Sequence, residues 1–201
     1  MEQRSDEWFS ARLGKVTASK LNDMLAKTRS GYSTSRNNYL IQLVSERLTG
    51  QRVESYINNA MQHGIDTEDE ARNAYVFKYA DVVEEGFVDH PTIPMCGASP
   101  DGLVGDDGLI EIKCPLATTH TQTLMSGEAP KKYINQMQWQ MACTGRKWCD
   151  FVSYCPSFPS NLQLFVKRVE RDDKLIEELE DEVKKFLEEV DQNVNKLKEI
   201  E

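Results

Sequence analysis

The sequence predicts an α/β domain with a central mixed sheet, helices on its flanks and one long helix at the C-terminus. Three observations lead to this prediction. Apolar runs bounded by glycine and aspartate clusters in residues 97–115 are typical of a β-hairpin. Several other segments carry apolar residues at helical spacing. Residues 172–201 keep that spacing without interruption.

Length and composition indicate one globular domain spanning residues 1–201. Hydrophobic residues make up 39% of the chain, and no apolar run approaches the ~20 residues that cross a bilayer. The N-terminus lacks the apolar segment of a signal peptide, and the five cysteines include no CxxC pair. We therefore expect no membrane partner, no structural zinc site, and reduced thiols in a cytoplasm.

The net charge of −9 at pH 7 does not by itself favour a nucleic-acid partner. The charge is unevenly distributed, however. Residues 1–60 contain nine basic and six acidic residues, whereas residues 172–201 contain five basic and twelve acidic ones. An acidic outer surface with a basic inner groove can still bind DNA, so the net charge does not exclude such a partner.

Four helices are expected in the first eighty residues, over residues 5–13, 20–26, 38–49 and 60–80. The first should bury a stripe formed by Trp8, Phe9 and Leu13. The last should be interrupted early by Gly64, and its inner side is expected to carry Ala71, Ala74, Tyr75 and Phe77. Residues 27–38 are polar and are expected to form a loop, either a DNA-contacting one or a solvated connection.

Strands are expected as a pair within residues 82–95 and as two further runs over residues 148–155 and 162–169. Between them, a helix should begin near Pro130 and end near Cys143. Its glutamines differ in direction, because residues four apart share a helix face: Gln136 and Gln140 lie together, whereas Gln138 points elsewhere. The C-terminal helix should be capped by Asp172 and Asp173.

Within the hairpin, two carboxylates and a lysine are spaced to converge. Asp101 lies in a Pro-Asp-Gly turn, and a second turn covers residues 105–108. Glu111 and Lys113 lie on one face of the second strand, because side chains alternate along a strand. If the hairpin bends at its start, the Asp101 carboxylate reaches the same point.

Such a trio suits metal-assisted hydrolysis. Two hard oxygen ligands favour Mg²⁺ or Mn²⁺, and a neighbouring lysine can orient or activate a water or stabilise phosphate charge. The alternative is structural. Asp-Gly is a common turn, and a Glu-x-Lys pair is also the ordinary polar face of a half-buried strand.

A second candidate site lies near the N-terminus. Arg12 precedes the hydroxyls of Thr17 and Ser19 at the start of a helix, an arrangement that can bind phosphate. The alternative is that Thr17 or Ser19 only caps the helix and that Arg12 is a surface residue. Among the acidic residues of the fourth helix, Glu68 is the candidate to face the metal site.

Taken together, these motifs resemble the lambda exonuclease family, the YqaJ-like viral recombinases of the PD-(D/E)xK nuclease superfamily. The resemblance covers nearly the whole chain and rests on six motifs in matching order: Trp8-x3-Arg12-Leu13-Gly14, Val16-Thr17-Ala18-Ser19, Gly64-x3-Glu68-x2-Ala71, Ser99-Pro100-Asp101-Gly102, Glu111-Ile112-Lys113-Cys114-Pro115 and Gln136-Met137-Gln138. It implies a restriction-endonuclease-like core.

The resemblance also implies an activity. It is that of a Mg²⁺-dependent, processive 5′→3′ exonuclease that digests the 5′-phosphorylated strand of double-stranded DNA. The 3′ single strands that remain serve recombination beside a single-strand annealing protein. Relatives form ring-shaped homotrimers, and the expected setting is the cytoplasm of a bacterial host, with the protein encoded by a phage or prophage.

By this resemblance, Asp101, Glu111 and the Ile112 carbonyl would bind two Mg²⁺ ions, for which Mn²⁺ can substitute. Lys113 would position and help deprotonate the attacking water. Glu68 would act through a bound water or the second metal, and Gln138 would lie near the active centre. Arg12, Ser19 and Ser99 would bind the 5′-terminal phosphate, with Thr17 close by. Arg29 would follow the duplex groove, and Met61 would be an apolar wedge that helps split the end base pairs.

Three other functions remain open from the residues. The same fold can carry a site-specific or structure-specific DNA endonuclease. Cys143, Cys149 and Cys155 raise the possibility of an iron–sulfur nuclease, although their wide spacing argues against a cluster. A non-catalytic DNA-end binder is the third, and the intact Asp101, Glu111 and Lys113 set argues against it.

Overall fold

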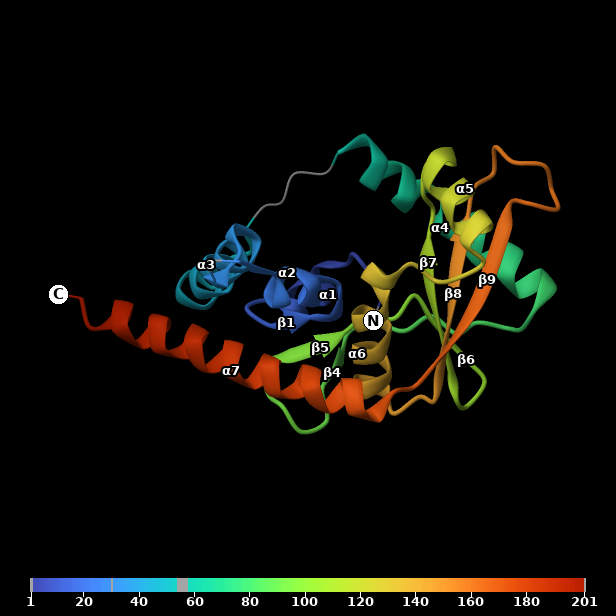
Figure 1. Cartoon of the computed structure of the whole chain (residues 1–201). Coiled ribbons are helices and arrows are strands. Elements are labelled where there is room, and N and C mark those ends of the chain that lie inside the picture. Colours follow the sequence, from blue (N-terminus) through green and yellow to red (C-terminus); the bar gives the residue numbers. More distant parts are fainter. Residues whose placement is uncertain (1, 30, 54–57, 201) are drawn as a thin grey trace.

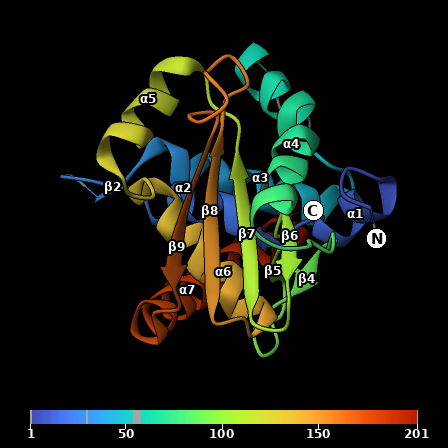
Figure 2. The same cartoon turned by 90° about the vertical axis from the view of Figure 1, so that its right-hand side faces the viewer.

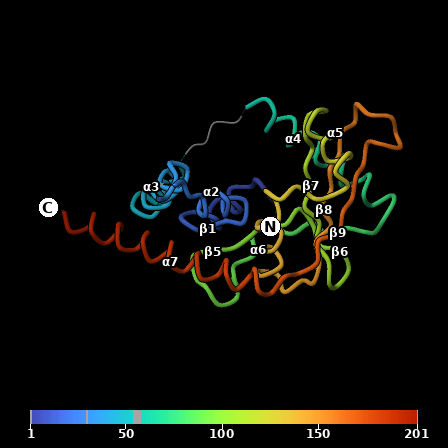
Figure 3. The backbone as a smooth tube through the Cα atoms, in the orientation of Figure 1, coloured from blue at the N-terminus to red at the C-terminus, as the bar shows by residue number. Residues whose placement is uncertain are grey.

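The main sheet lies at one end of the molecule and the C-terminus at the other (Figure 1). The computed structural model describes residues 2–29, 31–53 and 58–200. Helix α7 (Asp173–Lys198), drawn in red, begins beside the last strand and extends away from the sheet toward the C-terminus. The chain trace in Figure 3 follows the same course. The predicted α/β architecture with a long C-terminal helix is confirmed.

In the described part of the chain, the other helices are α1 (Asp6–Arg12), α2 (Leu21–Leu25), α3 (Thr34–Thr49), α4 (Asn59–Lys78), α5 (Ala117–Ser126) and α6 (Ile134–Thr144), with 3₁₀ turns η1 (Ala18–Lys20) and η2 (Lys131–Tyr133). The strands are β1 (Val16–Thr17), β2 (Lys27–Thr28), β3 (Gly31–Tyr32), β4 (Val88–Asp89), β5 (Cys96–Ala98), β6 (Gly102–Val104), β7 (Gly108–Lys113), β8 (Trp148–Tyr154) and β9 (Leu164–Glu170).

The main sheet has the strand order β6-β7-β8-β9. Strands β7 and β8 run parallel, joined by the crossover through α5 and α6, and the two outer pairs are antiparallel, so the sheet is mixed. A smaller sheet, β1-β5-β4, forms beside it, with β1 parallel to β5. The short link from β5 to β6 carries the chain directly from one sheet into the other.

Helices cover both faces of the main sheet (Figure 2). On one face Tyr75 of α4 packs in the same cluster as Ile110 of β7. On the other, Met137 of α6 packs with Leu109 of β7. Strand β7 is therefore buried on both sides, and every residue in it except Lys113 is buried. A polar side chain on this strand has to find its partners inside the protein.

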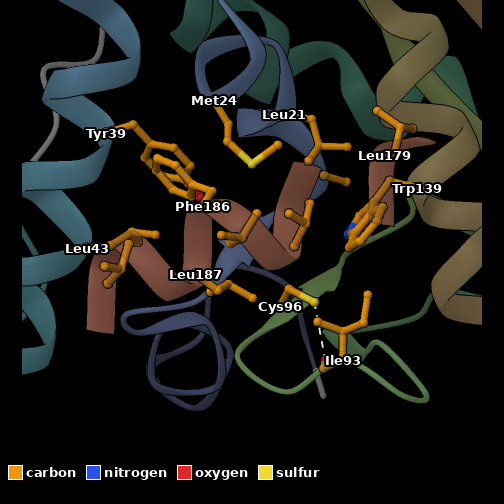
Figure 4. Close-up of a cluster of buried hydrophobic side chains, with 14 of the residues drawn as sticks. Leu21, Met24, Tyr39, Leu43, Ile93, Cys96, Trp139, Leu179, Phe186 and Leu187 are labelled. Carbon is orange, nitrogen blue, oxygen red and sulfur yellow. Dashed lines mark hydrogen bonds between the residues drawn. The ribbon is translucent and has the colours of Figure 1, made fainter. Parts of the chain in front are cut away.

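A second core joins α7 to α3, α2 and α6 (Figure 4). Phe186 of α7 is 1% exposed, and its ring stacks on that of Tyr39 with centroids 5.6 Å apart. Trp139 of α6, at 0% exposure, belongs to the same cluster. Helix α6 therefore packs on this core as well as on the sheet.

Two predictions for residues 27–49 are wrong. The expected loop over residues 27–38 instead contains the β2–β3 hairpin and the first turn of α3, which begins four residues earlier than predicted. Ser33 caps α3 by accepting a hydrogen bond from the Arg36 amide at 3.2 Å, which explains the earlier start. Residue 30 in this loop, and residue 201 at the end of the predicted final helix, lie outside the described residues.

Helix α1 has the predicted position and the Ser5 cap, but none of its residues is buried. The predicted buried stripe of Trp8, Phe9 and Leu13 is therefore wrong. These side chains are half-buried because they line a pocket instead of a closed core. Apolar residues at this spacing can line a pocket as well as fill a core, and the sequence pattern does not distinguish these two cases.

Three details of the region from α4 to β4 also differ from expectation. Helix α4 runs through Gly64 without interruption. Phe77 is 89% exposed, because two residues along a helix turn the side chain about 200° away from the face on which Tyr75 is buried. The expected strand pair over residues 82–95 is reduced to β4 and one bridge between Val83 and Leu103. In the described residues, no helix is long and apolar enough to span a membrane.

Replacement of the Phe186 ring tests the second core. Because the side chain is fully buried against Tyr39, Phe186→Ala should lower the free energy of unfolding by about 3–5 kcal/mol. Phe77→Ala is the matched control, since that ring is exposed, and should change stability by less than about 0.5 kcal/mol. Urea unfolding followed by circular dichroism measures both. Equal losses in the two variants would contradict this packing.

Candidate active site

The β6–β7 hairpin brings Asp101 and Glu111 to neighbouring positions. Gly102 pairs with Ile110, so the next residues outward, Asp101 and Glu111, face each other across the two strands. The Asp101 Oδ2 accepts a hydrogen bond from the Ile112 amide at 2.7 Å, which bends the aspartate over the end of β7. The bend at the start of the hairpin that the sequence required is present.

Glu111 is fully buried, at 0% exposure, between β7 and α6. Its Oε1 accepts from Gln136 Nε2 at 2.7 Å, and its Oε2 accepts from Gln140 Nε2 at 2.6 Å. The Lys113 ammonium forms an ion pair with Oε1. The alternative of an ordinary polar strand face is therefore wrong, because α6 covers the face on which Glu111 and Lys113 lie.

The electrostatics of this cluster show an excess of buried negative charge. Burial raises the pKa of Asp101 well above its usual range, and the Glu111 and Glu68 carboxylates raise it further against the opposing charge of Lys113. For Lys113, burial alone would lower the pKa, but the Glu111 and Asp101 carboxylates outweigh it and raise the value. Two carboxylates thus share one ammonium in a setting that favours a further cation.

The donors present fit a hard cation. Oxygen atoms of Asp101 and Glu111 are the ligands that Mg²⁺ prefers, and Ile112 belongs to the same strand end. Gln140 Oε1 is also buried and has no hydrogen-bond partner among the described residues. The described residues contain no group of three or more His, Cys, Asp or Glu side chains arranged around a metal position. Any cation would therefore need backbone, amide or water oxygens to complete its ligands.

Glu68 lies close enough to this cluster to raise the pKa of Asp101. Its carboxylate is held by Arg4 at 2.6 Å and by Arg72 at 3.2 Å, and it is 17% exposed. The structure thus brings Glu68 to the edge of the site while two arginines neutralise it.

The predicted placement of Gln138 at the active centre is wrong. Its Nε2 donates to the Glu170 carbonyl at 2.8 Å, and its Oε1 accepts from the Asp172 amide at 2.8 Å. Two residues along a helix turn the side chain by about 200°, so Gln138 faces β9 and the start of α7 while Gln136 and Gln140 face Glu111. The helix-face argument from the sequence was the correct guide, and the family motif was not.

The predicted phosphate residues meet at a pocket of about 390 Å³ that is lined by Arg12, Thr17, Ser19 and Met61 among others. Arg12 Nη1 donates to Ser99 Oγ at 3.1 Å, and Trp8 Nε1 donates to the same oxygen at 2.9 Å. Burial lowers the pKa of Arg12 to about 10. The guanidinium remains charged at neutral pH, in a place where its charge is poorly screened.

The hydroxyls of Thr17 and Ser19 do not cap a helix, which was the alternative that the sequence left open for them. Thr17 is the N-cap of η1, but its side chain makes no capping bond, and α2 has no side-chain cap either. Thr17 Oγ1 and Ser19 Oγ lie 3.5 Å apart at the pocket instead. Arg29 is separate from this group, exposed in the β2–β3 turn. Ser99 and Asp101, two residues apart, connect the pocket to the carboxylates.

Sequence reasoning missed part of the site. Gln136 and Gln140 were recognised as a shared face but not as partners of Glu111. Trp8 was assigned to a buried stripe, although it donates to Ser99. Arg52, which also lines the pocket, was not singled out. The spacing of the two glutamines was the signal that could have located them.

Two of the three cysteines that raised the possibility of an iron–sulfur centre, Cys143 and Cys149, do not lie together. Cys143 packs in the core under α7, and Cys149 packs beneath the sheet with Leu109. Both are buried free thiols whose pKa values burial raises. An iron–sulfur centre would require them to meet, and they lie in separate clusters.

The mixed sheet with a carboxylate–lysine hairpin has the arrangement expected of the PD-(D/E)xK class of proteins. Within that class, the model of the YqaJ-like viral recombinase domain matches residues 7–147. The chain belongs to the YqaJ-like viral recombinase family, as the motif resemblance predicted.

Solved structures agree with this assignment. The chain is 52% identical to an alkaline exonuclease, LHK-Exo, from Laribacter hongkongensis, with a TM-score of 0.90 and 96% of each chain covered. A second structure of LHK-Exo, in complex with dAMP, gives a TM-score of 0.91 over the same coverage. A phage related exonuclease from Haemophilus somnus 129PT shares the fold, with a TM-score of 0.72 at 14% identity, over 91% of this chain and 96% of that one. No curated protein sequence matches.

The contacts of Gln138 with β9 and the start of α7 can be tested by measuring stability. Gln138→Met should lower the free energy of unfolding by about 1–3 kcal/mol, because it removes both bonds between α6 and the start of α7. Gln122→Met, on the exposed side of α5, is the control and should leave stability unchanged within about 0.5 kcal/mol. Urea unfolding measures both. An unaltered midpoint in the Gln138 variant would show that these bonds do not hold α7.

Proposed function

We propose that this protein is a DNA exonuclease that digests the 5′-phosphorylated strand of a duplex in the 5′→3′ direction and leaves 3′ single strands. The 52% identical relative is an alkaline exonuclease, and it has been solved with dAMP, a nucleoside monophosphate of the kind that such a reaction releases. Its similarity over 96% of the chain supports the same reaction class here.

The observation that carries the proposal is the short distance between two sites. Ser99 contacts Arg12 in the phosphate pocket, and Asp101 lies two residues later beside Glu111. Two residues of chain span at most about 7 Å. Gln140 Nε2 lies 2.6 Å from Glu111 Oε2 and 3.5 Å from the Ser99 carbonyl, so one amide contacts both sides. A terminal phosphate held in the pocket would place a nearby phosphodiester at the carboxylates.

The residues then divide the work of phosphodiester hydrolysis. Asp101, Glu111 and the Ile112 carbonyl would hold two Mg²⁺ ions, or Mn²⁺ in their place, which supply charge neutralisation and a more acidic water when bound. Lys113 would orient the attacking water, help remove its proton and stabilise charge on the phosphate. Gln136 and Gln140 would fix Glu111, and Glu68 would act from the edge of the site through a water or the second ion.

The remaining DNA contacts follow from position. Arg12, Thr17, Ser19 and Ser99 would bind the terminal phosphate. Arg29 on the exposed β2–β3 turn would follow the duplex. Met61, which is 50% exposed at the pocket, would wedge between the end bases.

Family membership extends the proposal to the assembly. A homotrimeric ring around the DNA would make digestion processive, and the 3′ strands would pass to a single-strand annealing protein. The setting would be the cytoplasm of a bacterial host that carries the phage or prophage.

Digestion of linear duplex with one 5′ end blocked tests reaction and polarity together. With Mg²⁺, we expect only the strand with the free 5′ end to shorten, and with EDTA we expect no cleavage. A covalently closed plasmid is the control, because an exonuclease needs an end. Cutting of the closed circle would replace the proposal with the alternative, a site-specific or structure-specific endonuclease.

The role of Lys113 can be tested separately. Lys113→Ala should reduce cleavage by at least about a thousandfold, because it removes a charge at the reacting phosphate, while duplex binding persists. Gel-based cleavage and fluorescence anisotropy measure the two quantities. Turnover close to the unmodified protein would reject the assignment of Lys113.

A further inference from the structure

Five basic side chains line the phosphate pocket, and two of them differ from the rest. Arg4, Lys15 and Lys20 each form an ion pair with a carboxylate at 2.6–2.9 Å. Arg12 and Arg52 form no ion pair with any residue in the described ranges. Guanidinium groups without an ion-pair partner attract an anion more strongly than paired ones, because no carboxylate is bonded to them directly.

An aromatic pair on α1 holds both guanidinium groups. The rings of Trp8 and Phe9 meet edge to face with centroids 5.0 Å apart. The guanidinium of Arg12 lies 4.0 Å from the Trp8 ring centre, and that of Arg52 lies 3.9 Å from the Phe9 ring centre. Stacking on an aromatic face restrains a guanidinium without using its hydrogen-bond donors, which stay available for a ligand.

A buried carboxylate connects the segments that carry the two arginines. Glu46 of α3 is 5% exposed, and its Oε2 accepts from the Gly14 amide at 2.9 Å, two residues after Arg12. Its Oε1 lies 3.4 Å from the Val53 amide, next to Arg52. Because these bonds use both carboxylate oxygens, Glu46 ties the end of α1 and the segment after α3 to a single point.

We propose that Arg52 is a second phosphate-binding residue, which together with Arg12 makes the pocket select a terminal phosphate monoester over an internal phosphodiester. A monoester carries a charge of about −1.5 to −2 at neutral pH, whereas a diester carries one negative charge. Two guanidinium groups match the doubly charged form. The inference rests on the proposed function, since it assigns the specificity of the same pocket.

Equilibrium binding in EDTA tests this without cleavage. The measured quantity is the ratio of dissociation constants for two otherwise identical duplexes, one with a 5′-hydroxyl and one with a 5′-phosphate. Arg52→Gln should reduce the preference for 5′-phosphate about tenfold or more, the effect of losing one hydrogen bond to a charged group. Arg52→Lys keeps the charge without the planar group, so its preference for 5′-phosphate should lie between those of the unmodified protein and Arg52→Gln.

Arg146→Gln is the matched control, because Arg146 lies between α6 and β8 and does not line the pocket. It should keep the full preference. Below about pH 6 the phosphate gains a proton, so the preference of the unmodified protein should shrink while that of Arg52→Gln changes less. Thermal unfolding checks that the variants are folded, and Arg52 is exposed, so no loss of stability is expected.

The outcomes separate this inference from the function on which it rests. Full 5′-phosphate preference in Arg52→Gln, with loss in Arg12→Gln, would overturn the role of Arg52 and keep the pocket. Equal affinity of the unmodified protein for both duplexes would overturn the pocket as a terminal-phosphate site. An exonuclease assay that fails while the binding preference holds would remove only the proposed reaction.

Discussion

The burial of Glu111 is the constraint on which the rest of the site depends. An ionised carboxylate in a protein interior is costly unless it is paired and hydrogen-bonded. Strand β7 is covered on both faces, so Glu111 cannot turn to solvent, and its oxygens are bonded by Gln136, Gln140 and Lys113. These bonds fix the rotation of α6 about its axis.

That rotation has consequences beyond the hairpin. With Gln136 and Gln140 facing Glu111, Gln138 points to the opposite side and holds the amide of Asp172 at the start of α7. Asp172 in turn caps α7 by accepting from the Leu175 amide at 3.0 Å. Helix α6 therefore contacts both the Glu111 carboxylate of the sheet and the core between α3 and α7.

The proposed phosphate pocket is built differently from the carboxylate cluster. Two of its aromatic residues, Trp8 and Phe9, belong to a helix with no buried residue, and they support guanidinium groups instead of filling a core. Ser99 joins the two regions, because its hydroxyl contacts Trp8 and Arg12 while the carboxylate of Asp101 lies two residues along the chain. This short link is the feature on which the proposed exonuclease reaction depends.

The sequence by itself determined the α/β class, the long final helix, the hairpin and the convergence of Asp101, Glu111 and Lys113, because turns and strand alternation are local properties. It also held the family motifs. Only the tertiary structure decided which glutamines meet Glu111, that Trp8 and Phe9 face a pocket, and that Arg52 joins Arg12. Those outcomes depend on how helices rotate and pack against strands that are distant in the sequence. The spacing of apolar residues indicates which face of a helix is buried, but it does not identify the residues that pack against that face.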